Sequence, residues 1–119
     1  MDDMPDAGPT FHYPRDGAIR LNQLQAKGSH NSYHLATVDP KQVPALAYSH
    51  PPLDQQFEKE GVRQIELDIH FDYVNQSYEV YHIGDIDPGT TCFLLSDCLK
   101  LVKGWSDKNP AHQPIFIQL

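Results

Sequence analysis

The sequence is short of basic residues and of cysteine, and it has no long hydrophobic run. Nine Lys and Arg stand against sixteen Asp and Glu in 119 residues, giving a formal charge of -7 at pH 7. Because binding along a phosphate backbone needs clustered cations, we expect no nucleic-acid partner. The same charge opposes adsorption to anionic membranes. Contact with lipid would therefore depend on a local site, a metal ion or apolar insertion.

The sequence shows neither a membrane-spanning segment nor a secretory signal. No apolar run approaches the roughly 20 residues that span a bilayer, and the first ten residues lack the basic and apolar regions of a secretory signal. Cys92 and Cys98 are too few for a disulfide framework and lack the His or Cys neighbours of a zinc site. Their spacing allows a local disulfide in an oxidising compartment, and two half-buried helix cysteines would fit as well.

The composition supports one folded domain preceded by an arm. With 39% hydrophobic residues, a chain of 119 residues can bury one modest core. Residues 1–19 contain several prolines and glycines and have no sustained periodicity, so we expect an extended N-terminal arm there. Residues 20–119 carry all of the predicted helices and strands.

Six segments of this domain have the patterns of secondary structure. Pro52 and Gly61 mark the ends of the first predicted helix, and a second helix carries apolar residues from Leu94 to Trp105. Because helices alternate with strands, the order favours an α/β fold with a parallel sheet. Strands are predicted at residues 24–27, 62–71, 77–83 and 115–119, and helices at residues 53–60 and from 94 to the stop signal at 109–110.

The second predicted strand has two unlike faces. Apolar residues alternate with Glu66 and Asp68, whose side chains would project on one side about 7 Å apart. If the sheet closes into a barrel, these carboxylates point inward and repel each other. A hard cation with oxygen ligands would relieve the repulsion, and calcium is common where carboxylate and amide oxygens converge. A polar strand face open to water would show the same alternation.

Two histidines lie near the ends of the neighbouring predicted strands. His30 and Asn31 follow the first strand, and His82 falls near the end of the third. Because the carboxyl ends of parallel strands meet on one side, we expect these residues to lie near Glu66 and Asp68. A pair of imidazoles can take a proton from a nucleophile and return one to a leaving group, as phosphodiester cleavage requires. Taken singly, each histidine is more typical of an ordinary surface or core position.

Several separated motifs make a more specific resemblance. The segments Gly28–His34, Glu66–Asp68 and Val80–His82 resemble the N-terminal signature segments of calcium-dependent phosphatidylinositol-specific phospholipase C. The runs Tyr48–Leu53 and Trp105–Ile117 are similar to the bacterial and fungal subgroup of these phospholipase C-like phosphodiesterases. The resemblance covers about residues 21–119. It implies the first half of a TIM-type (β/α) barrel, with about four parallel strands and flanking helices.

The resemblance also implies roles for individual residues. His30 and His82 would flank the phosphodiester, and Asn31, Glu66 and Asp68 would bind Ca2+. The family cleaves phosphatidylinositol-type lipids by attack of the inositol 2-hydroxyl on the adjacent phosphate, giving diacylglycerol and a cyclic inositol phosphate. His82 would be the general acid, and His30 would stabilise the phosphate or take a proton. Phosphoinositides or related phosphodiester lipids would be the partners, through transient contact with a membrane surface, and relatives of this subgroup are often secreted.

The sequence departs from the family pattern after its last predicted strand. There the family carries a further glutamate, a calcium ligand, whereas this chain stops at Leu119 and Gln118 is no substitute. We therefore expect an N-terminal part of a longer enzyme. A glycerophosphodiester phosphodiesterase-like enzyme shares the barrel and the Glu-x-Asp pair, but it typically has Arg where Asn31 stands. A catalytically incomplete fragment or pseudoenzyme would bind a phosphorylated headgroup or a partner without turnover. The oligomeric state is left open.

Overall fold

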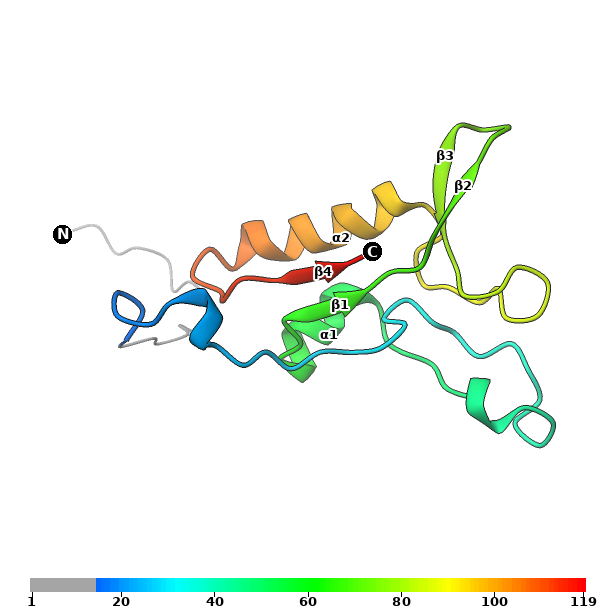
Figure 1. Ribbon diagram of the computed structural model, residues 1–119, viewed down its shortest axis with the longest axis horizontal. Coiled ribbons are helices and arrows are strands. Elements are labelled where there is room, and N and C mark those ends of the chain that lie inside the picture. Colours follow the sequence, from blue (N-terminus) through cyan, green and yellow to red (C-terminus); the bar gives the residue numbers. More distant parts are fainter. Residues whose placement is uncertain (1–14) are drawn as a thin grey trace.

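The computed structural model describes residues 15–119, in which two helices accompany a pair of parallel strands (Figure 1). Strand β1 (Gln64–Glu66) pairs in parallel with β4 (Phe116–Gln118), and Ile65 lies opposite Ile117. Helices α1 (Leu53–Glu60) and α2 (Leu95–Lys108) pack against each other. Helix α2 lies in the connection that leads back to β4, so the parallel pairing follows the expected crossover.

Both predicted helices are confirmed, and their ends lie close to the residues that mark them in the sequence. Helix α1 follows Pro52 and ends at Gly61, whose φ of 68° lies in the left-handed region that glycine adopts most readily. Asp54 in the first turn and Lys59 in the last turn oppose the partial charges at the two helix ends. Helix α2 ends immediately before Asn109, as predicted.

The core forms where the two helices meet β1. The rings of Phe57 on α1 and Trp105 on α2 lie 5.3 Å apart, and the Arg63 guanidinium lies 4.5 Å from the centre of the Trp105 ring. Leu101 and Val102 pack partly against this core, as their helical spacing predicts. The buried apolar residues are Tyr33, Leu53, Phe57, Val62, Ile65, Leu67, Val80, Cys92, Cys98 and Trp105.

The predicted strand at residues 62–71 is divided between two sheets. After β1 the chain leaves the parallel pair, and β2 (Ile69–Asp72) pairs antiparallel with β3 (Ser77–Val80). Residues 73–76 alone join these two strands, too short a link for a parallel crossover. The third predicted strand therefore differs from the expected parallel arrangement, and it forms a hairpin that projects away from β1 and β4 (Figure 1).

The first predicted strand, at residues 24–27, is not a strand in the structure. A short extended segment around Gly28 lies beside β1 instead. Gly28 makes a parallel bridge to Gln64, and the backbone N–H groups of Ser29 and Ser32 donate to the carbonyls of Gln64 and Glu66. The segment thus follows β1 in parallel on the edge not used by β4. Closure into a (β/α) barrel stays a prediction.

Most of the predicted N-terminal arm, residues 1–14, lies outside the described residues. The part that is described begins with a turn and continues into a 3-10 helix at Leu21–Gln23, and a second 3-10 helix lies at Pro44–Leu46. Within residues 15–119, no helix has the length and apolar character that crossing a bilayer requires.

The two cysteines form a disulfide, which decides between the two alternatives left by the sequence. Cys92 lies in the loop before α2 and Cys98 lies in the first turns of α2, with Cα atoms 5.3 Å apart. Both residues are buried. The cross-link therefore fastens this loop to the helix.

Candidate functional site

The predicted calcium ligand Asn31 lies in a tight turn beside the end of β1. Its φ of 46° is in the left-handed region, which asparagine tolerates better than most residues. The side chain is buried, and its Nδ2 donates to the Tyr48 hydroxyl at 2.9 Å. Because the amide nitrogen is engaged in this way, the Oδ1 atom is left as the group able to contact a ligand.

Glu66 and Asp68 lie at and just beyond the end of β1, and both are partly buried. The Glu66 carboxylate is 3.7 Å from Nε2 of His30, whose side chain is 77% exposed. The Tyr33 hydroxyl donates to Oδ2 of Asp68 at 2.7 Å. Burial, followed by this hydrogen bond, raises the pKa of Tyr33 well above its usual range, so the phenol keeps its proton.

These residues supply donors of the right chemistry for part of a calcium site. Within residues 15–119, no three side chains among His, Cys, Asp and Glu are grouped so as to hold a metal ion. Asn31, Glu66 and Asp68 offer one amide and two carboxylates, all hard oxygen donors. Calcium takes six to eight oxygens, so these residues fit a calcium site only together with further ligands such as water or a substrate phosphate.

His82 is held by a carboxylate that the sequence analysis did not single out. Its Nδ1 lies 2.8 Å from Oδ2 of Asp87, and the side chain of His82 is 29% exposed. Asp87 is fully buried and also faces Nε2 of His34, at 2.8 Å from Oδ1 and 2.7 Å from Oδ2. One buried carboxylate therefore joins two imidazoles.

The buried His34 connects this carboxylate to the predicted ligand Asn31. Nδ1 of His34 lies 2.8 Å from the backbone carbonyl of Tyr48, and the two rings stack with centroids 4.2 Å apart. Tyr48 in turn accepts the hydrogen bond from Asn31. The contacts run without interruption from Asn31 through Tyr48, His34 and Asp87 to His82.

The predicted site residues thus make three separate sets of contacts. His30 approaches Glu66, Asp68 is bound by Tyr33, and Asn31 and His82 belong to one continuous network. Asp87 was missed because its segment, Asp-Pro-Gly, has only the pattern of a turn. No spacing rule relates it to His34, which is 53 residues away in the sequence.

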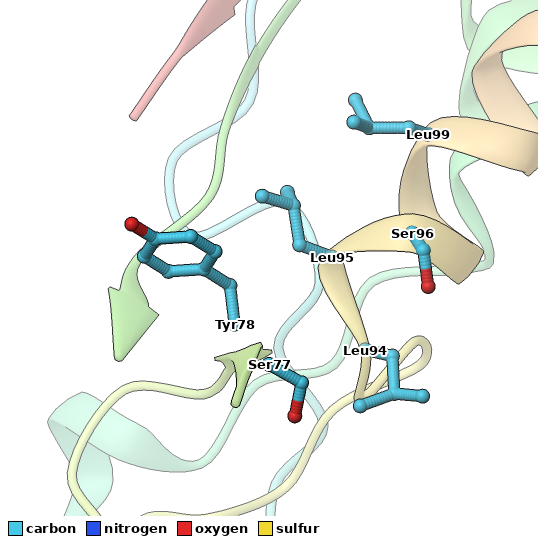
Figure 2. A pocket seen from close by; sticks show the side chains of 6 residues that line it. All are labelled: Ser77, Tyr78, Leu94, Leu95, Ser96 and Leu99. Carbon is cyan, nitrogen blue, oxygen red and sulfur yellow. The ribbon is translucent and has the colours of Figure 1, made fainter. Parts of the chain in front are cut away.

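A surface pocket of about 290 Å³ lies elsewhere, between β3 and the start of α2. Figure 2 shows that its wall is mostly apolar, with the Tyr78 ring on one side and leucine side chains of the α2 segment on the other. It contains none of the predicted site residues. Its lining is Ser77, Tyr78, Leu94, Leu95, Ser96 and Leu99.

The family model described as Ca2+-dependent phosphoinositide phospholipase C matches residues 19–78 and 72–119. The chain belongs to this family of phospholipase C-like proteins. No curated protein and no solved structure matches it.

Proposed function

We propose that this protein is a phosphoric diester hydrolase of the bacterial and fungal subgroup, cleaving phosphatidylinositol-type lipids in a Ca2+-dependent reaction. In this proposal the chain supplies the first half of a (β/α) barrel, with His30 and His82 as the catalytic residues. One observation carries it: Asn31 and His82, distant in sequence, belong to one hydrogen-bonded network beside the end of β1, where His30 approaches Glu66. The family match favours this reaction over that of a glycerophosphodiester phosphodiesterase-like enzyme.

In the proposed reaction one histidine acts on the attacking hydroxyl and the other on the leaving group. The inositol 2-hydroxyl forms a bond to phosphorus as His30 takes its proton. The bond from phosphorus to the diacylglycerol oxygen breaks, and His82 gives that oxygen a proton from Nε2, since its Nδ1 faces Asp87. Asn31, Glu66 and Asp68 would hold calcium, which when bound acidifies the hydroxyl and neutralises charge on the phosphate.

The hairpin supports the proposed contact with a membrane surface. Tyr73 and Val74 at its tip are 83% and 89% exposed, and the rings of Phe71 and Tyr78 lie beside each other just below, also partly exposed. An acidic protein has no general attraction to anionic lipid, so a small apolar tip offers the required local contact. The hairpin also rises directly from the segment that carries Asp68.

The test is calcium-dependent turnover by the full-length protein on vesicles that contain phosphatidylinositol. We expect release of diacylglycerol and a cyclic inositol phosphate, abolished by a calcium chelator and reduced at least about 10²-fold by His82→Ala. His112→Ala is the matched control, because His112 contacts Ser106 and the Trp105 ring on α2 and no site residue. Turnover by His82→Ala at the rate of the unmodified protein would contradict the proposal.

A further inference from the structure

In the reaction as written above, the buried carboxylate of Asp87 appears only as the neighbour of Nδ1 of His82. The Asp87 side chain is fully buried, yet both of its oxygens face imidazole nitrogens at 2.7 to 2.8 Å. Removing a carboxylate from water is unfavourable unless charged or hydrogen-bonded partners replace the water. Here both partners are histidines, and they come from segments far apart in the sequence.

We propose that Asp87 is the positioning residue of His82 and that His34 locks Asp87 in place. This inference rests on the proposed function, in which His82 donates a proton to the leaving group. A carboxylate accepts only from a protonated nitrogen, so Asp87 assigns a proton to Nδ1 of His82 and leaves Nε2 for the substrate. It also stabilises the positive charge of the imidazolium before the proton is transferred, as the aspartate of a Ser-His-Asp triad does.

The loop between His82 and Asp87 is built to hold this geometry. The backbone N–H of Asp87 donates to the carbonyl of Ile83 at 2.7 Å, and the N–H of Ile83 donates to the carbonyl of Asp87 at 3.2 Å. These reciprocal bonds close the loop on itself. The carboxylate is therefore fixed relative to the backbone that carries His82.

A glycine lets the same loop dock against the segment that carries His34. A Cβ atom at Gly89 would lie 2.0 Å from the backbone oxygen of Leu35, the residue after His34. Contacts this short do not occur, and the obstacle is backbone that cannot turn aside. Only glycine therefore allows Asp87 to approach His34 in this way.

His34 itself is in no position to react with a substrate. It is fully buried, and both of its ring nitrogens are engaged. Nδ1 donates to the Tyr48 carbonyl and Nε2 donates to the Asp87 carboxylate, because both of these groups can only accept. The hydrogen bond at Nδ1 and the stacking on Tyr48 fix the ring plane, so Nε2 is held against Asp87.

The decisive variant is Asp87→Asn in the full-length protein, with Asp85→Asn as the matched control from the exposed part of the same loop. We expect Asp87→Asn to lower kcat on phosphatidylinositol by about 10²-fold or more, with KM changed only a few fold. In a His82→Ala background the same change should cause no further loss, because Asp87 acts through His82. A kcat within about threefold of the control, or an equal loss in both backgrounds, overturns the proposal.

A spectroscopic readout separates this inference from the proposed reaction. We expect a slowly exchanging downfield proton resonance from the Nδ1–H of His82, absent in His82→Ala and shifted upfield in Asp87→Asn, because a neutral acceptor forms a weaker hydrogen bond. Asp85→Asn should leave it unchanged. If the unmodified protein lacks this resonance, the inference is wrong even where the Asn variant fails to fold. If the resonance behaves as expected but no diacylglycerol is released, only the proposed function fails.

Discussion

At the scale of single residues, the Tyr33 hydroxyl orients Asp68 for its proposed role as a calcium ligand. The phenol is fully buried and donates to one carboxylate oxygen, leaving the other for a ligand. Because its pKa is raised, chiefly by burial, the hydroxyl remains a donor under conditions where an ordinary tyrosine would begin to ionise. Asp68 therefore keeps one fixed orientation.

We expect Tyr33→Phe to lower the free energy of unfolding by about 1 kcal/mol, because a buried hydrogen bond to a carboxylate is lost. Tyr73→Phe, which removes an exposed hydroxyl, should cause no measurable change. The folded state keeps Tyr33 protonated, so its contribution is complete below about pH 10, where an unfolded tyrosine ionises, and declines as the pH rises further. Urea denaturation of both variants at neutral and alkaline pH measures this, and equal stabilities at neutral pH would refute it.

At the scale of secondary structure, the hairpin is ordered by its own turn. Asp72 accepts hydrogen bonds from the Asn75 side chain and from the backbone N–H groups of Val74 and Asn75. The first of these bonds is the largest cause of a lowered pKa at Asp72, followed by the bond from Val74. The turn thereby presents Tyr73 and Val74 outward at a fixed distance from the site.

We expect the double variant Tyr73→Ser, Val74→Ser to bind phosphatidylinositol vesicles about tenfold more weakly or worse, since two apolar side chains can no longer enter the lipid. Vesicle co-sedimentation measures this. Leu21→Ser is the control, because Leu21 is an exposed apolar residue in the 3-10 helix Leu21–Gln23, outside the hairpin. An equal loss in the control, or no loss in the double variant, would show that the tip does not contact the membrane.

The helices and the apolar face of residues 62–71 could be predicted from the sequence, but the pairing of the strands could not. Pro52, Gly61 and Asn109 mark helix ends through local chemistry, and both helices lie where these residues put them. The apolar face predicted by the alternation from residue 62 to 71 includes Ile65 and Leu67, and both are buried in the core. The alternation continues unbroken where the chain changes sheet, because the partners of β1 and β2 are set by segments distant in sequence.

The candidate site shows the same division between local and distant information. Glu66, Asp68 and His30 could be proposed from their position at predicted strand ends, and their motif made the family recognisable. Asp87 could not be found, since its importance arises only when a turn meets a histidine 53 residues earlier in the chain. Asp87 becomes buried only when the chain folds, so its burial cannot be predicted from the sequence.

At the scale of the whole molecule, the proposed calcium ligands Asn31, Glu66 and Asp68 need further oxygens to complete a site. We expect the 119-residue chain to bind Ca2+ weakly, with a Kd on the order of 10⁻⁴ M or above, because the proposed ligands amount to two carboxylates and one amide. Isothermal titration calorimetry measures this, with Glu66→Gln expected to weaken binding further and Asp97→Asn, on α2, expected to have no effect. Micromolar affinity in the chain would contradict the expectation that further ligands are needed.

The disulfide between Cys92 and Cys98 has a practical consequence for how such experiments are prepared. The cross-link closes a short ring that ties α2 to the loop following Asp87, and a ring of this size contributes about 2 kcal/mol to folding. Strong thiol reductants in the buffer would open it, and production in a reducing cytosol would prevent it from forming. Samples made under oxidising conditions are therefore the proper material for measuring turnover.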